Sequence, residues 1–206
     1  MSVIDTLHLN PGELWLDPRF LTAAEAGNLF DLLIREVNWQ QGTITLFGKK
    51  RVIPRLQAFM ADPGVKYRYS GKTLLTEAWH PAVQDLVSRI EQHTGTRFNA
   101  VLLNLYRHGS DSMGWHSDDE PELGADPVIA SLSLGAERTF MLRRKKRNKG
   151  ERSVKLNLVH GSLLWMGPGM QRHWQHSLPK NPRSQTPRIN LTFRQIITRP
   201  DPTDHN

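Results

Sequence analysis

The stretch Arg188-Ile189-Asn190-Leu191-Thr192-Phe193-Arg194 decides the fold class of this chain. Its three apolar residues alternate with four polar ones. Because successive side chains of a β-strand point to opposite faces, this pattern predicts a strand with one apolar face and one entirely polar face. The polar face can point to solvent, as on an edge strand, or toward a site inside a barrel.

Other short segments with β-strand character occur from residue 99 onward. They are apolar or β-branched runs bounded by turn residues, which is typical of strands. Including the stretch above, there are six of them: residues 100–106, 129–134, 139–142, 153–158, 162–166 and 189–197. Such a series predicts a β-sandwich or a barrel.

The first half of the chain contains two predicted helices. Thr22 and Glu25 form a potential capping box before an amphipathic run, and Pro81 opens a second run that ends before Gly95. Between these helices, residues 42–72 mix Gly, Pro, basic and aromatic residues without a clean period. That mixture predicts short strands joined by a mobile hairpin, a suitable place for a lid over a substrate.

Composition indicates one basic, cysteine-free domain. The 206 residues contain no internal repeat and carry a formal net charge of +7. This charge favours a polyanionic partner such as nucleic acid, although a merely basic protein would share it. The absence of cysteine excludes disulfides and thiolate metal sites, so a metal would be held by nitrogen and oxygen, as suits a reducing cytoplasm.

No targeting segment is evident in the sequence. No apolar run is long enough to span a membrane, and residues 1–10 lack the basic flank, apolar centre and cleavage signal of a secreted protein. We therefore expect an intracellular monomer, cytoplasmic in a bacterium and nuclear in a eukaryote, with no membrane contact.

His116 and Asp118 are candidate metal ligands. On an extended segment, side chains two residues apart point the same way, toward one ion. For the third ligand we choose His176 over its competitor His173, because His176 precedes a Leu-Pro break and lies twelve residues before Arg188. Two imidazoles and one carboxylate form the ligand set of non-haem iron(II) oxygenases, which keeps positions open for oxygen and a co-substrate. An exposed acidic turn is the alternative.

The two arginines of the final strand suggest what that co-substrate is. Arg188 can pair bidentately with a carboxylate, a geometry that lysine cannot reproduce with one point charge. An iron site that uses a dicarboxylate needs such a group. A solvated edge strand is the alternative for this polar face.

Taken together, these motifs resemble those of the AlkB-type iron(II)- and 2-oxoglutarate-dependent nucleic-acid dioxygenases. The resemblance covers about residues 19–197, and its RxNxTFR signature carries no substitution. The matching segments are Asn104-Leu105-Tyr106, His116-Ser117-Asp118-Asp119-Glu120, His176-Ser177-Leu178-Pro179 and residues 187–194. The resemblance implies a mainly β fold with flanking helices (α+β), a double-stranded β-helix of the jelly-roll, cupin-like type.

The resemblance also implies how the chain is organised. Residues 1–98 would hold the N-terminal helices and a nucleotide-recognition lid, residues 99–197 the catalytic β-helix core, and residues 198–206 a tail, all in one folded domain. The cofactor would be iron(II), held by His116, Asp118 and His176 as the catalytic residues, with 2-oxoglutarate and O2 as co-substrates. Residues expected to bind 2-oxoglutarate are Asn104, Tyr106, Arg188, Asn190, Thr192 and Arg194.

The activity implied is oxidative dealkylation of 1-methyladenine and 3-methylcytosine in DNA, with release of formaldehyde and succinate. Two alternatives stay open: a related oxygenase that demethylates RNA or protein, and a nucleic-acid-binding β-barrel without chemistry, in which the histidines are structural or bind zinc. The partner would be single- or double-stranded DNA, with RNA possible.

Lid residues resemble those of the branch that repairs duplex DNA, where the damaged base must leave the stack. Phe47 would intercalate as a finger, unless it is an ordinary core residue, and Arg55 would help fill the vacated space. Tyr69 would stack on the base opposite His116, and Glu120 would contact its exocyclic amine. The full set of expected substrate contacts is Phe47, Arg55, Tyr67, Tyr69, Ser70, Asp119 and Glu120, the last two of which could instead form a solvated acidic turn.

Basic clusters are expected to contact the phosphate backbone, which positions a nucleic acid without reading its sequence. The densest cluster is residues 143–149, and a thinner one follows the distant histidine. A solvated basic loop is the alternative. The residues concerned are Lys49, Arg143, Arg144, Lys145, Lys146, Lys180 and Arg183.

Overall fold

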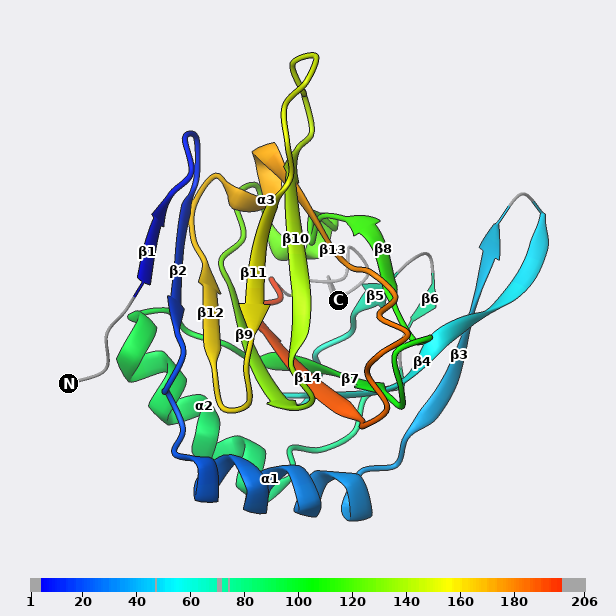
Figure 1. Ribbon diagram of the computed structural model, residues 1–206. Helices are drawn as coiled ribbons and strands as arrows, with labels where there is room; N and C mark the ends of the chain where they lie inside the picture. Colours follow the sequence, from blue (N-terminus) through cyan, green and yellow to red (C-terminus); the bar gives the residue numbers. More distant parts are fainter. Residues whose placement is uncertain (1–4, 47, 70–71, 74, 198–206) are drawn as a thin grey trace, which may run out of the picture.

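Two antiparallel β-sheets face each other in the computed structural model, which describes residues 5–46, 48–69, 72–73 and 75–197 (Figure 1). Within these ranges the larger sheet contains β1 (Asp5–His8), β2 (Glu13–Asp17), β3 (Gln40–Leu46), β4 (Lys49–Ala61), β7 (Ala100–Tyr106), β9 (Ile129–Gly135), β12 (Leu163–Met166) and β14 (Arg188–Arg194). The smaller sheet contains β8 (Met113–His116), β10 (Arg138–Arg144), β11 (Val154–Leu158) and β13 (Trp174–Leu178).

Strand order in the larger sheet is β1-β2-β12-β9-β14-β7-β4-β3, and in the smaller one β11-β10-β13-β8. Successive strands therefore alternate between the sheets along much of the second half of the chain, as in a double-stranded β-helix. This is the jelly-roll fold that the sequence predicts. A small pair, β5 (Arg68–Tyr69) with β6 (Lys72–Thr73), stands beside the sheets.

Two helices, α1 (Ala23–Glu36) and α2 (Pro81–Thr94), cover the outer face of the larger sheet (Figure 1). The predicted capping box is present, because Thr22 Oγ1 accepts from the Glu25 amide at 3.2 Å and the Glu25 carboxylate accepts from the Thr22 amide at 2.7 Å. α2 ends at Gly95, whose φ of 69° is left-handed and suits glycine. No helix in the described ranges is long and apolar enough to cross a membrane.

β14 lies at the centre of the larger sheet, between β9 and β7. Ile189, Leu191 and Phe193 are fully buried on the side that packs against the helices. The polar residues of β14 line a cavity between the two sheets instead. The polar face therefore points into the barrel, and the alternative of a solvated edge strand is wrong.

The secondary structure of residues 42–72 differs from the short strands that the sequence predicts. β4 is 13 residues long, pairs with β7 through its second half and forms a projecting hairpin with β3 through its first half. The β3–β4 register shifts near Pro54, which has no amide to donate to a ladder. Such a shift breaks the two-residue period, and this explains why the sequence pattern hides a long strand.

Candidate active site

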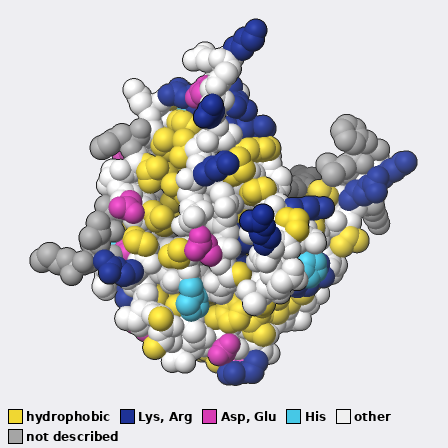
Figure 2. Space-filling model, viewed as in Figure 1, with side chains coloured by type: hydrophobic (Ala, Val, Ile, Leu, Met, Phe, Trp, Pro, Cys, Tyr) yellow, Lys and Arg dark blue, Asp and Glu magenta, His cyan; other side chains and the backbone are white. Residues whose placement is uncertain are grey.

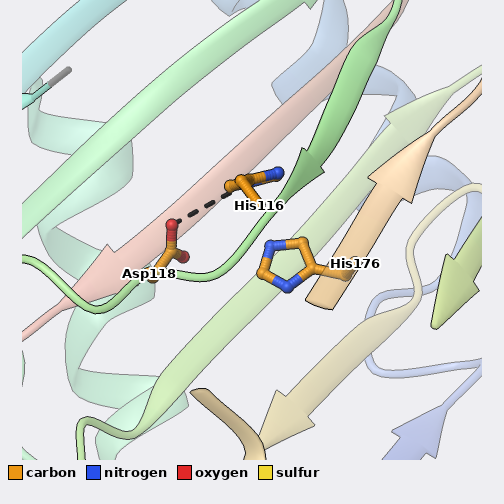
Figure 3. Close-up of side chains that lie close together, drawn as sticks. All are labelled: His116, Asp118 and His176. Carbon is orange, nitrogen blue, oxygen red and sulfur yellow. Dashed lines mark ion pairs between the residues drawn. The ribbon is translucent and has the colours of Figure 1, made fainter. Parts of the chain in front are cut away.

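His116, Asp118 and His176 come together between the two sheets (Figure 3). His116 ends β8, Asp118 follows two residues later, and His176 lies on β13 directly opposite His116 in the strand register. One ligand atom from each residue lies within 4.8 Å of the others. The competing His173 belongs to the short helix α3 (Met170–His173) and is not a member of this group.

Neighbouring groups fix the orientation of these side chains. His116 Nδ1 lies 2.9 Å from the Gly114 carbonyl oxygen, so this nitrogen carries the proton and Nε2 is available for a metal. The Asp118 amide donates to Gln171 Oε1 at 2.9 Å, and the His176 ring stacks on Phe140 with centroids 5.2 Å apart. Sequence reasoning did not identify Gln171 or Phe140, because neither residue type marks a metal site.

The triad is already in the protonation state that binds a metal. Burial lowers the pKa of His176 to about 3, helped by the nearby His116, and burial also lowers the pKa of His116. Burial alone would raise the pKa of Asp118, but Arg194 and the two histidines hold it at about 2. At neutral pH the site therefore presents two neutral imidazoles and one carboxylate.

A cavity extends from this triad along β14. All the side chains predicted to bind 2-oxoglutarate line it: Asn104, Tyr106, Arg188, Asn190, Thr192 and Arg194. Arg194 lies at the metal end, where its Nη2 is 3.0 Å from Asp118 Oδ2. Arg188 lies at the far end, over the ring of Tyr106 at 5.5 Å. The cavity thus has a guanidinium group at each end.

Buried hydrogen bonds hold the wall of the cavity in place. Arg188 Nη2 donates to Ser133 Oγ at 2.9 Å, and Asn190 Nδ2 donates to Ser131 Oγ at 2.8 Å. Sequence reasoning missed both serines, although they alternate with apolar residues in the predicted strand 129–134. Gln57, also missed, donates to Asn104 Oδ1 at 3.0 Å.

Buried polar atoms without a hydrogen-bond partner lie at both ends of the cavity, and they indicate whether a metal and a dicarboxylate would fit there. Among the described residues, the buried atoms Asp118 Oδ1 and Arg188 Nε have no hydrogen-bond partner. Burial lowers the pKa of Arg188 to about 10, so its side chain still carries a charge at neutral pH. Buried charges are costly unless they are paired. A cation at Asp118 and a carboxylate at Arg188 satisfy both groups, so the donor set fits iron(II) and 2-oxoglutarate.

Comparison with known proteins agrees with this geometry. The family model of the 2OG-Fe(II) oxygenase superfamily matches residues 13–194. The chain belongs to this superfamily. Its relatives are of the AlkB type, and the superfamily uses iron(II), 2-oxoglutarate and O2, the first two of which fit the donor set described above.

Two curated relatives of this AlkB-type oxygenase have similar identities. The bovine alpha-ketoglutarate-dependent dioxygenase alkB homolog 3 is 44% identical over 194 residues, which cover 91% of this chain and 66% of the relative. The mouse DNA oxidative demethylase ALKBH2 is 44% identical over 182 residues, covering 84% and 76% respectively. The chain thus spans about two thirds of the bovine relative's length.

The solved structure of OsALKBH1 has the same fold. It superposes with a TM-score of 0.60 at 16% identity and covers 93% of this chain and 100% of that one. At this identity the likeness concerns the fold alone, and it supports the jelly-roll assignment.

Two residues that were predicted to contact the substrate of this AlkB-type oxygenase, Arg55 and Tyr67, are buried in the structure. Arg55 is 4% exposed, and its Nε donates to Asn104 Oδ1 at 2.8 Å. It therefore supports the cavity wall, and the expectation that it fills a gap in the duplex was wrong. Tyr67 is fully buried against Phe59 and lies under Arg194 at 5.7 Å, so it supports that guanidinium group and presents no open face to a base.

The adjacent carboxylates Asp119 and Glu120 face different surroundings. Asp119 is exposed and pairs with Lys145 Nζ at 2.7 Å. It is therefore directed away from the cavity, which agrees with the alternative of a solvated turn and not with a substrate contact. Glu120 is half-buried, and burial together with nearby Asp118 raises its pKa. Phe47 and Ser70 lie outside the described residues, as does the side chain of Tyr69.

The predicted phosphate contacts fall on two projecting hairpins and on the loop between β13 and β14. Figure 2 shows Lys and Arg side chains gathered on the β10–β11 hairpin, at the top, and on the β3–β4 hairpin, at the right. Exposed residues of the predicted set are Lys49, Lys145, Lys146, Lys180 and Arg183. Arg143 is half-buried, stacks on Trp115 at 4.2 Å and donates to Gln175 at 3.0 Å, whereas Arg144 pairs with Glu151 at 3.2 Å.

Proposed function

We propose that this protein repairs N-alkylated bases in DNA by oxidative demethylation, acting on 1-methyladenine and 3-methylcytosine. The observation that carries the proposal is the cavity in which the metal triad and Arg188 lie in series along β14. Glu120 does not line this cavity, but it follows Asp118 by two residues, and burial together with the charge of Asp118 raises its pKa. Relatives that are 44% identical, among them a DNA oxidative demethylase, support it.

The cavity residues have distinct tasks in this proposal. When bound, iron(II), 2-oxoglutarate and O2 would supply the chemistry: one oxygen atom of O2 goes into a carbon–hydrogen bond of the methyl group, and 2-oxoglutarate takes the other and becomes succinate and CO2. His116, Asp118 and His176 would hold the metal, and Arg188 would hold the far carboxylate. The hydroxylated methyl group then leaves the ring nitrogen as formaldehyde, and the base is restored.

Glu120 is the residue that we assign to the base itself. Alkylation at these ring nitrogens gives a base that can carry positive charge and that keeps an exocyclic amine. A half-buried carboxylate near the metal end can accept a hydrogen bond from that amine and stabilise the charge. A base inside a duplex must first leave the stack, at a cost of a few kcal/mol that is lowest for a damaged pair.

Exposed cations on the two projecting hairpins and on the loop between β13 and β14 supply the affinity for a polyanion. Lys49 lies on the β3–β4 hairpin, Lys146 on the β10–β11 hairpin, and Lys180 and Arg183 on the loop between β13 and β14. Contacts of this kind attach the phosphate backbone without reading sequence. The intercalating role of Phe47 stays a prediction.

The test is a repair assay. The purified protein is incubated with iron(II), ascorbate and 2-oxoglutarate on oligonucleotides that carry 1-methyladenine or 3-methylcytosine, as single-stranded DNA, duplex DNA and RNA. Base mass and formaldehyde are followed, with His176→Ala as the inactive variant and His173→Ala as its matched control. We expect repair by wild type and by His173→Ala. Absence of repair on every substrate would refute the proposal, and repair confined to RNA would reassign the substrate.

A further inference from the structure

Arg138 is a buried guanidinium group behind the far end of the cavity. It is the first residue of β10 and is 2% exposed, yet it does not belong to the cavity lining. Its Nη2 donates to the carbonyl oxygens of Asp111 at 2.9 Å and Pro179 at 2.6 Å. The Asp111 carbonyl belongs to the loop between β7 and β8, and the Pro179 carbonyl belongs to the loop that follows β13. Arg138 therefore links the start of β10 to both loops.

Tyr106 connects Arg138 to the cavity. The guanidinium carbon of Arg138 lies 5.9 Å from the centroid of the Tyr106 ring, and that of Arg188 lies 5.5 Å from it. Both distances are within the range of cation–π contacts. Since Tyr106 and Arg188 line the cavity and Arg138 does not, Arg138 acts on a ligand through the tyrosine and through its charge.

Positive charge is in excess at this end of the cavity. Burial lowers the pKa of Arg138, and the charge of Arg138 contributes to the lowered pKa of Arg188. The charge of Asp111 partly offsets that of Arg138, but this carboxylate already accepts from Arg107 Nε at 2.8 Å and from Arg107 Nη2 at 3.0 Å. Two buried cations are thus balanced mainly by carbonyl groups, a hydroxyl and a ring, and a bound anion relieves that imbalance.

We propose that Arg138 is a positioning residue for the far carboxylate of 2-oxoglutarate: it holds Tyr106 beside Arg188 and supplies a second positive charge that makes the cavity select a dicarboxylate. The inference depends on the use of 2-oxoglutarate and not on which base is repaired.

The same residue connects the co-substrate to two surface loops. The Gly109 amide donates to the Ser184 carbonyl at 2.7 Å, and the Asn181 amide donates to the Gly109 carbonyl at 2.8 Å. The loops are so close that a Cβ on Gly109 would lie 1.7 Å from the Asn181 carbonyl oxygen. Because Arg138 bonds to both loops, an anion that steadies Arg138 also steadies the bonds between them.

The decisive experiment measures binding without turnover. Dissociation constants of 2-oxoglutarate and of 2-oxovalerate, which has the same 2-oxo acid group but no far carboxylate, are measured on protein loaded with Mn(II). Arg138→Gln is compared with Arg138→Lys, which keeps the charge, and with Arg107→Gln, a control that loses a bond to the same loop. We expect Arg138→Gln to weaken 2-oxoglutarate binding about tenfold, the scale for removing an outer partner of a binding group, with 2-oxovalerate unchanged.

Arg138→Lys should regain most of the preference for the dicarboxylate, and Arg107→Gln should keep it. An unchanged preference in Arg138→Gln overturns the proposal, and so does an equal loss for both acids, which would indicate a merely structural role. Hydrogen exchange of the wild-type protein gives a second test, which does not depend on whether a variant folds. 2-Oxoglutarate should slow exchange of the Gly109 and Asn181 amides more than saturating 2-oxovalerate does, and equal protection overturns the proposal.

Discussion

Arg194 Nη2 lies 3.0 Å from Asp118 Oδ2, and both side chains are almost completely buried. This contact joins the metal ligand to the strand that carries the 2-oxoglutarate residues. It also explains why Asp118 keeps a pKa of about 2 in a buried site, since Arg194 is the strongest of the charges that oppose the effect of burial.

Replacing Arg194 with Gln should therefore damage both stability and metal binding. The change leaves Asp118 buried without its cation, which costs about 3–5 kcal/mol for pairs of this kind. We expect a matching fall in the free energy of unfolding in urea and weaker Mn(II) binding. Arg183→Gln, an exposed arginine of the neighbouring loop, is the control. Wild-type stability and metal affinity in Arg194→Gln would mean that this ion pair is dispensable.

The capping box of α1 predicts a pH dependence of stability. Backbone and side-chain hydrogen bonds from Thr22, followed by Arg89, lower the pKa of Glu25 from 4.5 to about 2. A depressed folded-state pKa stabilises the protein above the ordinary value, and this contribution is lost as the pH falls from 4.5 toward 2. Because Glu25 is exposed, Glu25→Gln should cost only about 1 kcal/mol or less at pH 7.

Urea unfolding of wild type and Glu25→Gln across this pH range measures that difference. Asp31→Asn, an exposed carboxylate of the same helix, is the matched control. The difference between wild type and Glu25→Gln should shrink as the pH falls toward 2. A difference that stays constant down to the lowest pH would assign the effect to something other than the carboxylate charge.

Features encoded by neighbouring residues were predictable from the sequence. β14 follows from strict alternation, and the capping box of α1 follows from Thr22 and Glu25 alone. β13 was missed, although it carries His176, because this short strand shows no period and owes its conformation to pairing within the smaller sheet. Of β8, only an extended segment at His116 was predicted. Their ligands were still found, since residue type and order in the chain identified them.

Side-chain surroundings could not be predicted where the partner is distant in sequence. Arg55 was expected to reach DNA, but it bonds to Asn104, 49 residues away. Tyr67 has the residue type of a base-stacking group, and only the packing of β4 and β7 against it shows that it is buried. Arg138 had no sequence signal at all, because its role depends on two loop carbonyls and a ring.

Glu120 and Asp119 form a matched pair of carboxylates for testing base recognition. Glu120→Gln should lower kcat/KM for a methylated base by about 10- to 100-fold, the equivalent of one charge-assisted hydrogen bond of about 1.5–3 kcal/mol. Asp119→Asn should have little effect, because Asp119 faces Lys145. Both variants should bind 2-oxoglutarate as wild type does. Equal activity of the two variants would remove Glu120 from the base-binding site.

Lys180 and Arg183 predict a salt-dependent contact between their loop and a phosphate backbone. Both residues are exposed on the loop between β13 and β14, and the strand opposite the damaged base is the one that we expect this loop to contact. The double variant Lys180→Ala/Arg183→Ala should bind duplex more weakly, with the slope of log K against log salt reduced by about 0.9 for each lost contact. Binding to single strands should change little.

Arg35→Ala is the control, because Arg35 is exposed in the last turn of α1, on the helical side of the larger sheet. Affinity is measured by fluorescence anisotropy between 50 and 200 mM salt, the range in which counterion release changes affinity by about 10³ or more for an extensive phosphate interface. Equal slopes for wild type and the double variant on duplex would show that this loop does not touch the backbone. Equal losses on duplex and single strands would show that it touches the damaged strand.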